Sequence, residues 1–253
     1  NAALLGPNAA PGSPECDALI REVRREMTLK AGQKCTAIRR ILVPAEHIDA
    51  VESALVEQLA GVAVGDPRND TVRMGPLVNK AQQAAAREGL EDLKRDARVV
   101  LGDGDPELVD ADPGQGAFFP LTLLRCDDPT GAQSVHSVEV FGPVATLMPY
   151  ESSEQAFALA ARGQGSLVTS VFTADEDFAL DAATALSPWH GRLALIDGEV
   201  AGANPGHGVV MPQCAHGGPG RAGGGEELGG LRALRFYHQR TAIQGGKERL
   251  EAL

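Results

Sequence analysis

Helical patterns alternate with short apolar runs along most of this chain, and this alternation constrains the fold more than any other feature. An amphipathic helix shows apolar residues every three to four positions, whereas a buried strand can be a short continuous apolar run. Strands that alternate with helices pair in parallel, so we predict an α/β fold of three layers, with a mainly parallel sheet between helices. The predicted helices span residues 14–30, 45–59, 80–95, 153–162 and 175–186, and the predicted strands span residues 38–43, 99–101, 118–124, 144–148, 167–172 and 193–196.

The segment from Lys30 to Arg40 places a thiol between a helix and a strand. Gly32 supplies a stop for the preceding helix, so Cys35 falls on the short connection before the apolar run that begins at Ile38. Catalytic groups tend to lie on such connections. A nucleophile would need a thiolate, favoured by backbone N–H groups of the turn or by nearby cations. These cations are Lys30, Lys34 and Arg39. A buried, inert cysteine fits the same spacing, so the residues alone leave both interpretations open.

The composition argues against several classes of function. A net charge of −11, with no basic run longer than two residues, argues against a nucleic-acid-binding protein. No apolar run suggests a membrane span, and 253 residues with 43% hydrophobic content can bury a core. Because the cysteines are scattered and no secretory signal opens the chain, we expect a cytoplasmic protein without disulfides. The histidines show no metal-ligand spacing, so no metal is expected.

A glycine-rich segment covers residues 217–230 and contains a G-x-G-x-x-G pattern from Gly218 to Gly223. A dinucleotide-binding loop of this pattern follows a strand and opens a helix. Pro212 interrupts the approaching strand and no helical pattern follows, so this interpretation fails, and a flexible loop is the plain alternative. The triplet that begins at His216 is similar to an esterase oxyanion loop, but the chain has no G-x-S-x-G elbow, which sets a serine hydrolase aside.

Two motifs carry a resemblance to a known family. Gly32-Gln33-Lys34-Cys35-Thr36-Ala37-Ile38-Arg39-Arg40 resembles the catalytic-cysteine motif of the aldehyde dehydrogenase superfamily. Val138-Glu139-Val140-Phe141-Gly142-Pro143-Val144 resembles that family's Glu-x-Phe-Gly-Pro segment, in the same order along the chain. The resemblance extends from Asn1 to about Gly246. Finer likeness over residues 25–40, 142–145, 163–167 and 216–232 points to a branch that oxidises CoA-linked semialdehydes in aerobic aromatic catabolism.

The resemblance implies a mechanism and three site residues. Cys35 would attack the aldehyde carbon, backbone N–H groups near it would hold the oxyanion, and water would hydrolyse the resulting thioester. Taken alone, Glu139 would be an ordinary solvated carboxylate. The resemblance implies that it accepts hydrogen bonds from the nicotinamide ribose hydroxyls of NADP or NAD, with Phe141 packed beside that ring. It also implies that the glycine-rich segment is a shaped loop near the aldehyde tunnel.

The resemblance also sets expectations about organisation. In the family, the dinucleotide-binding domain, an Asn that helps hold the oxyanion and a Glu that activates the water all precede the cysteine. We therefore expect this chain to be the C-terminal half, with residues 1–238 as the cysteine-bearing catalytic domain. Residues 239–253 would form a C-terminal oligomerisation strand and tail, in which an edge strand over 239–244 follows a helix over 231–238. This strand would bridge to a partner in a homo-oligomer, a dimer or a multiple of dimers.

The expected substrate is a small-molecule aldehyde at the far end of a CoA thioester from phenylacetate degradation. The alternative is 3,4-dehydroadipyl-CoA semialdehyde of the benzoate pathway. A second hypothesis is a binding or oligomerisation module without turnover, whose Cys35 would be no more reactive than the other three cysteines. A cysteine-dependent thioesterase is a third, and it requires a His beside Cys35. Neither nucleic acid nor a membrane is an expected partner.

Overall fold

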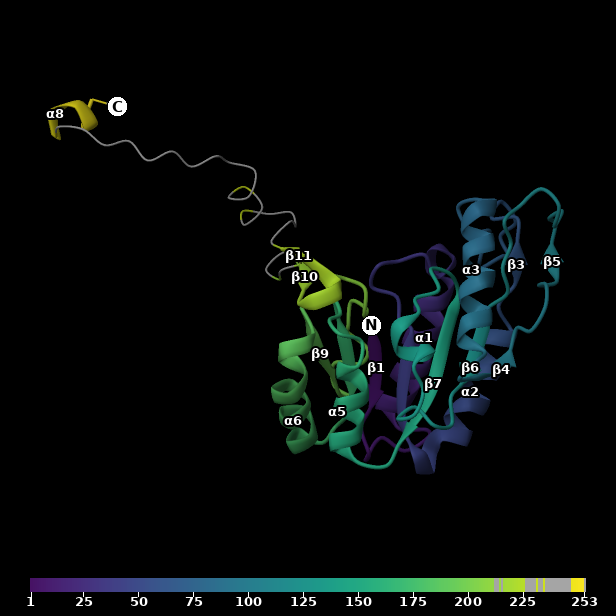
Figure 1. Cartoon of the computed structure of the whole chain (residues 1–253), viewed down its shortest axis with the longest axis horizontal. Helices are drawn as coiled ribbons and strands as arrows, with labels where there is room; N and C mark the ends of the chain where they lie inside the picture. Colours follow the sequence, from purple (N-terminus) through teal and green to yellow (C-terminus); the bar gives the residue numbers. More distant parts are fainter. Residues whose placement is uncertain (212–213, 215, 226–230, 232–233, 235–246, 253) are drawn as a thin grey trace.

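The computed structural model describes residues 1–211, 214, 216–225, 231, 234 and 247–252. Its centre is a seven-stranded sheet (Figure 1). In spatial order, the strands are β4 (Arg98–Leu101), β6 (Thr122–Arg125), β7 (Val144–Tyr150), β2 (Arg40–Pro44), β1 (Ala2–Leu5), β8 (Thr169–Phe172) and β9 (Leu193–Ile196). Neighbouring strands are parallel except for β4, which runs antiparallel to β6. The predicted α/β fold with a mainly parallel sheet is confirmed.

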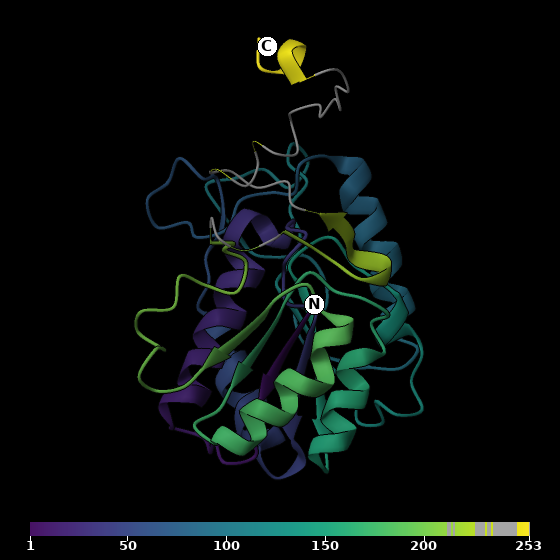
Figure 2. The same cartoon turned by 90° about the vertical axis from the view of Figure 1, so that its left-hand side faces the viewer.

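Helices cover both faces of this sheet, which gives the three predicted layers (Figure 2). One face carries α1 (Pro14–Thr28) and α2 (Ile48–Ala60), and the other carries α5 (Ser153–Ala161) and α6 (Glu176–Leu186). At one end of the molecule lie α3 (Lys80–Leu93) and a small parallel pair of strands, β3 (Val64–Gly65) and β5 (Leu108–Val109). The 3-10 helix η2 (Ala45–His47) leads into α2, the short helix α4 (Ser134–Ser137) precedes β7, η3 (Ser187–Trp189) follows α6, and α8 spans Lys247–Leu250.

Side-chain caps explain where four of these helices begin. In each case the oxygen of a residue before the first turn accepts a hydrogen bond from a backbone N–H that has no partner inside the helix. The pairs are Ser13 with Cys16 N (3.2 Å), Asn79 with Gln82 N (2.9 Å), Ser152 with Gln155 N (3.3 Å) and Asp175 with Phe178 N (3.0 Å). The starts of the corresponding predicted helices are correct to within one residue.

The strand β1 lies at the centre of the core and was not predicted from the sequence. Its four residues are fully buried, and it pairs in parallel with β2 on one side and β8 on the other. Ala2 lies opposite both Arg40 and Thr169, so three segments far apart in the sequence begin at the same level of the sheet. This level is where the candidate site lies.

Two sequence-based predictions need comment. The strand predicted over 118–124 forms only as Thr122–Arg125, because Pro120 has no N–H to donate to a neighbouring strand. The helix predicted over 231–238, the edge strand over 239–244 and the boundary at 238 lie almost entirely outside the described residues, so bridging and dimerisation stay predictions. Within the described part of the chain, no helix is long and apolar enough to cross a membrane.

Candidate active site

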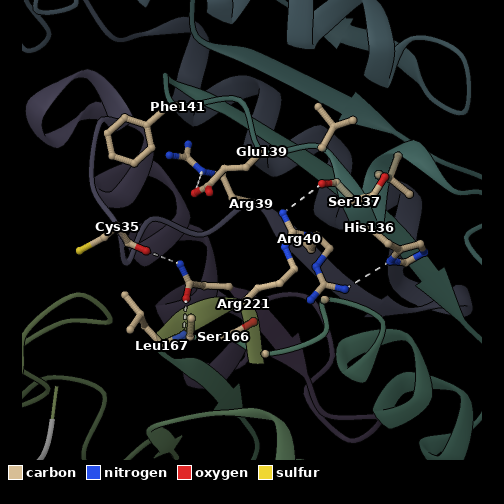
Figure 3. A pocket seen from close by; sticks show the side chains of 16 residues that line it. Cys35, Arg39, Arg40, His136, Ser137, Glu139, Phe141, Ser166, Leu167 and Arg221 are labelled. Atoms are coloured by element: carbon tan, nitrogen blue, oxygen red, sulfur yellow. Dashed lines mark hydrogen bonds and ion pairs between the residues drawn. The ribbon is translucent and has the colours of Figure 1, made fainter. Parts of the chain in front are cut away.

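The predicted site residues gather at the amino ends of the central strands. Cys35 precedes β2, and Glu139 and Phe141 precede β7. All three line one cavity of about 240 Å³, together with Leu167, which precedes β8. Figure 3 shows this cavity with Cys35 and Phe141 on one side. The structure thus brings together the three residues that sequence reasoning singled out, although Cys35 and Glu139 lie in separate motifs.

Cys35 lies on a turn after an abrupt end to α1. Thr28 ends the helix and the 3-10 turn η1 (Leu29–Gly32) follows, in which Lys30 and Ala31 adopt φ of 55° and 51°. Left-handed backbone is strained for residues with a Cβ, so the packing around this turn has to hold it. The thiol that follows is exposed, whereas those of Cys16 and Cys126 are buried. Cys35 is therefore not the buried cysteine that its spacing also allowed, and its reactivity stays a prediction.

Gly32 lets the nucleophile turn approach the loop that carries Glu139 and Phe141. Its φ is +69°, and a Cβ built on it would lie 2.3 Å from Gly142 O and 2.8 Å from Pro143 Cα. Both neighbours are backbone, so neither can swing aside. Glycine at this position is therefore required by its backbone conformation and by the close contact together.

Asn1 fixes the same turn from the other side. Its Nδ2 donates to Cys35 O (2.9 Å) and Ala37 O (3.0 Å), and its Oδ1 accepts from Leu167 N (3.1 Å) and Val168 N (3.2 Å). The amide thereby ties the backbone of the nucleophile to the start of β8. Sequence reasoning missed this role, because a single Asn gives no local signal for partners so distant along the chain.

Arg39 connects the two loops through its buried guanidinium. It donates to Gly142 O (2.5 Å) and Gly32 O (2.7 Å), and its Nε lies 3.8 Å from Glu139 Oε1. The guanidinium also lies 5.7 Å from the centre of the Phe141 ring, within cation–π range. Burial lowers the pKa of Arg39 to about 10, and it stays charged at neutral pH.

Of the three cations predicted to favour a thiolate at Cys35, two have other partners in the structure. Lys34 Nζ turns away to Glu26 Oε1 at 2.5 Å, in a pair that is almost fully buried. Burial raises the pKa of Glu26, and the hydrogen bond from Lys34 opposes that shift. Arg39 donates to the carbonyls of Gly142 and Gly32. These two cations therefore hold the turn in place through their own partners.

Arg40 and His136 form a buried pair on the far side of the cavity from the Cys35 sulfur (Figure 3). Arg40 Nη1 lies 3.2 Å from His136 Nδ1, and His136 Nε2 lies 2.8 Å from Pro129 O. A carbonyl can only accept, so Nε2 carries the proton and Nδ1 accepts from Arg40. Burial lowers the pKa of His136 to about 4, which keeps the ring neutral. Because both ring nitrogens are engaged, His136 cannot serve as the base that the thioesterase hypothesis requires.

The glycine-rich segment forms a hairpin beside this cavity. β10 (His216–Gly218) pairs antiparallel with β11 (Gly223–Gly225), and the 3-10 turn η4 (Gly220–Ala222) joins them. The G-x-G-x-x-G pattern thus makes a turn between strands and opens no long helix, as expected from its context. Arg221 and Ala222 line the same cavity as Cys35. This part of the segment is therefore shaped, and the interpretation of a bare flexible loop is wrong for it.

Among the described residues, no group of three His, Cys, Asp or Glu side chains is arranged to hold a metal ion. The site is thus built from one thiol, one half-exposed carboxylate, an aromatic ring and several guanidinium groups.

Comparisons with known proteins agree on a family. The model of the aldehyde dehydrogenase family matches residues 12–243. The chain is 52% identical over 221 residues to the 3,4-dehydroadipyl-CoA semialdehyde dehydrogenase of Aromatoleum evansii, covering 87% of this chain and 43% of that protein. It is 44% identical over 180 residues to Protein MaoC of Klebsiella aerogenes, covering 71% of this chain and 52% of that protein. The chain thus spans about half the length of these relatives.

Solved structures agree with this match. The betaine aldehyde dehydrogenase of Staphylococcus aureus in complex with NAD+ superimposes with a TM-score of 0.79 at 25% identity, covering 94% of this chain and 43% of that one. An oxidoreductase from Marinobacter aquaeolei gives a TM-score of 0.72 at 26% identity, covering 92% of this chain and 44% of that one.

Proposed function

The chain belongs to the aldehyde dehydrogenase family, and on this premise we propose that Cys35 is the nucleophile in the NAD(P)-dependent oxidation of an aldehyde to a carboxylic acid. One observation carries the proposal. Cys35, whose thiol is exposed, lines the same cavity as Glu139 and Phe141, the residues predicted to bind the nicotinamide ribose. A purely structural cysteine would need none of these neighbours.

The turn supports the first chemical step. The Cys35 thiolate adds to the aldehyde carbon, and the carbonyl oxygen becomes an oxyanion that needs a hydrogen-bond donor. Lys34 N–H donates to Gly32 O and Ala37 N–H donates to Lys34 O, whereas the described structure assigns no protein acceptor to Cys35 N–H. We therefore assign Cys35 N–H to the oxyanion of the thiohemiacetal. Asn1 holds the Cys35 carbonyl and so fixes the orientation of this turn.

Glu139 and Phe141 fit the expected cofactor. The Glu139 side chain is 47% exposed, and Arg39 Nε at 3.8 Å is too distant for a hydrogen bond, so its oxygens can accept from a ribose diol. Phe141 is 37% exposed and offers an apolar ring beside that carboxylate. When bound, NAD(P) supplies the hydride acceptor. Loss of hydride from the thiohemiacetal leaves a thioester on Cys35, and water then releases the carboxylic acid and restores the thiol.

The substrate we propose is the semialdehyde end of a CoA thioester. The 52% identity to a protein named as a 3,4-dehydroadipyl-CoA semialdehyde dehydrogenase supports this class. Phenylacetate degradation was the first prediction from the sequence and the benzoate pathway the alternative, and both carbon skeletons should be assayed.

The proposal is tested first through the thiol and then through turnover. With iodoacetamide and peptide mass spectrometry, Cys35 should be labelled at least about a hundredfold faster than Cys126, whose pKa burial raises to about 11. A semialdehyde should protect Cys35, because the thiohemiacetal consumes the thiolate. NADP and NAD reduction with each CoA-linked semialdehyde should then be lost in Cys35→Ala.

Labelling at equal rates without protection by aldehyde would favour a module that keeps the fold without turnover. Selective labelling and protection without NAD(P) reduction would support the nucleophile and count against turnover by this chain alone. Cys214→Ser is the matched control, because it removes the partly exposed thiol that does not line the cavity.

A further inference from the structure

The cavity beside Cys35 carries an excess of positive charge. Three guanidinium groups line it, from Arg39, Arg40 and Arg221, against the single carboxylate of Glu139. Glu139 lies nearest Arg39, and His136 is neutral because burial lowers its pKa to about 4. Two cations therefore have no counter-charge among the described residues of the cavity. The chain as a whole has a net charge of −11, so this excess is local.

Arg40 is held in place entirely by neutral groups. It is 4% exposed, and it donates to Leu159 O (2.8 Å), Ala160 O (2.9 Å) and the His136 ring. A buried cation is costly unless it is paired, and these acceptors offset only part of that cost. Burial first, and then the charges of Arg221 and Arg162, lower the pKa of Arg40 to about 10. The cation thus persists at neutral pH, close to other cations.

Arg221 is placed beside Arg40 by a specific local fold. Its backbone N donates to Gln164 O (3.0 Å), and its Nη2 donates to Ser137 O (3.1 Å). The turn at 163–165 has to be glycine-rich for this approach. A Cβ on Gly163 would lie 2.4 Å from Arg40 Nη2, and one on Gly165 would lie 2.0 Å from Pro219 O. Figure 3 shows the two guanidinium groups next to each other across the cavity.

Further donors border the same space. Ser166 is buried and lines the cavity below the Arg221 side chain in Figure 3, and its hydroxyl can donate a hydrogen bond. Arg39 Nε is buried without a hydrogen-bond partner, on a side chain that is only 10% exposed.

The adjacent positive charges of Arg40 and Arg221 are held by neutral groups, so their mutual repulsion is destabilising. An anion bound between the two guanidinium groups would remove that repulsion.

We propose that Arg40, Arg221 and Ser166 form a subsite for a small oxyanion, a carboxylate or a phosphate group, in the cavity that Cys35 also lines. Arg40 supplies a buried charge in a fixed orientation, and Arg221 supplies an exposed guanidinium that can close over the bound group. A carboxylate and a phosphate group would be bound in the same way, because a planar guanidinium can donate charge-assisted hydrogen bonds to two oxygens of either group. The subsite does not depend on the proposed dehydrogenase function.

The test is isothermal titration of inorganic phosphate and, separately, of acetate into the full 253-residue chain at constant ionic strength. Arg221→Gln removes an exposed charge at the subsite. Arg21→Gln is the matched control, because Arg21 is also exposed and does not line the cavity. We expect saturable binding by the wild type and by Arg21→Gln, and affinity lower by about tenfold or more in Arg221→Gln, since one charge-assisted hydrogen-bonding group is lost.

A second measurement locates the anion. Iodoacetate and iodoacetamide differ in charge, so the ratio of their labelling rates at Cys35 should fall in Arg221→Gln and stay unchanged in Arg21→Gln. Phosphate that binds more tightly than acetate would identify a phosphate group as the ligand, and the reverse order would identify a carboxylate. Absence of saturable binding to the wild type, or equal affinity in the two variants, would overturn the proposal.

Discussion

Replacing Gly32 with alanine tests whether the nucleophile turn really depends on backbone contact with the Glu139 loop. Gly32 has φ +69°, and its added Cβ would meet Gly142 O at 2.3 Å and Gly142 C at 2.6 Å. A Cβ in left-handed backbone costs about 1–2 kcal/mol. Forcing two backbone segments apart in a packed region adds about 1–3 kcal/mol. We therefore expect Gly32→Ala to lower the free energy of unfolding by about 2–5 kcal/mol.

Gly12→Ala separates the two contributions. Gly12 also has positive φ, at +86°, but nothing lies within 4 Å of an added Cβ. Its substitution should cost only the conformational term of about 1–2 kcal/mol. Urea denaturation followed by circular dichroism gives both values, and the difference between the variants measures the contact with Gly142.

The same substitution should alter the chemistry at Cys35. Moving the turn away from Gly142 also moves the two carbonyls that Arg39 bridges, so the rate of Cys35 alkylation should change in Gly32→Ala and not in Gly12→Ala. If Gly32→Ala is no more destabilising than Gly12→Ala, the close approach of the two loops is not what requires glycine, and this reasoning fails.

Two further predictions concern stability. Burial lowers the pKa of His190 from 6.5 to about 4, so the unfolded chain takes up the proton first as pH falls. The free energy of unfolding should therefore be retained above pH 6.5 and decline from there towards pH 4. The decline should be larger in the wild type than in His190→Gln, by up to about 3 kcal/mol, as measured by urea denaturation at several pH values. Tyr150→Phe should lower the free energy of unfolding by about 1–2 kcal/mol in the same assay, because the buried Tyr150 hydroxyl donates to Leu5 O at 2.5 Å. The same pH dependence in the wild type and His190→Gln would contradict the effect of burial on His190. An unchanged free energy of unfolding in Tyr150→Phe would contradict a stabilising hydrogen bond from Tyr150 to Leu5 O.

The sequence indicated the parts of this site that depend on local patterns. Periodicity and a glycine stop placed Cys35 on a connection between a helix and a strand, and the structure confirms that position. The two motifs placed Glu139 and Phe141 near it, and all three residues line one cavity. What depends on distant contacts could not be predicted. The nearby lysine at position 34 suggested support for a thiolate, yet its charge is bound by Glu26 on α1.

Asn1 and Arg221 illustrate the same limit. Asn1 bonds to Leu167, 166 residues away, and Arg221 bonds to Ser137, 84 residues away. A single amide or guanidinium has no period and no fixed spacing, so no window of sequence reveals such partners. Strand β1 was missed for a related reason, because a four-residue apolar run shows its importance only once β2 and β8 pair on either side.

The position of the site at the amino ends of the strands explains its chemical character. In open α/β sheets, ligands usually bind beyond the carboxyl ends, where carbonyls end each strand. At the opposite edge, the N–H groups of the segments that lead into the strands need acceptors. Asn1 Oδ1 accepts from two of them, at Leu167 and Val168, while the N–H of Cys35 has no assigned protein acceptor. Arg40 and Arg221 lie at the same edge, and the cavity that Cys35 lines has three guanidinium groups and a single carboxylate. Such an edge favours negative charge that develops on a bound ligand, which is what both an oxyanion on the Cys35 adduct and a small bound anion require.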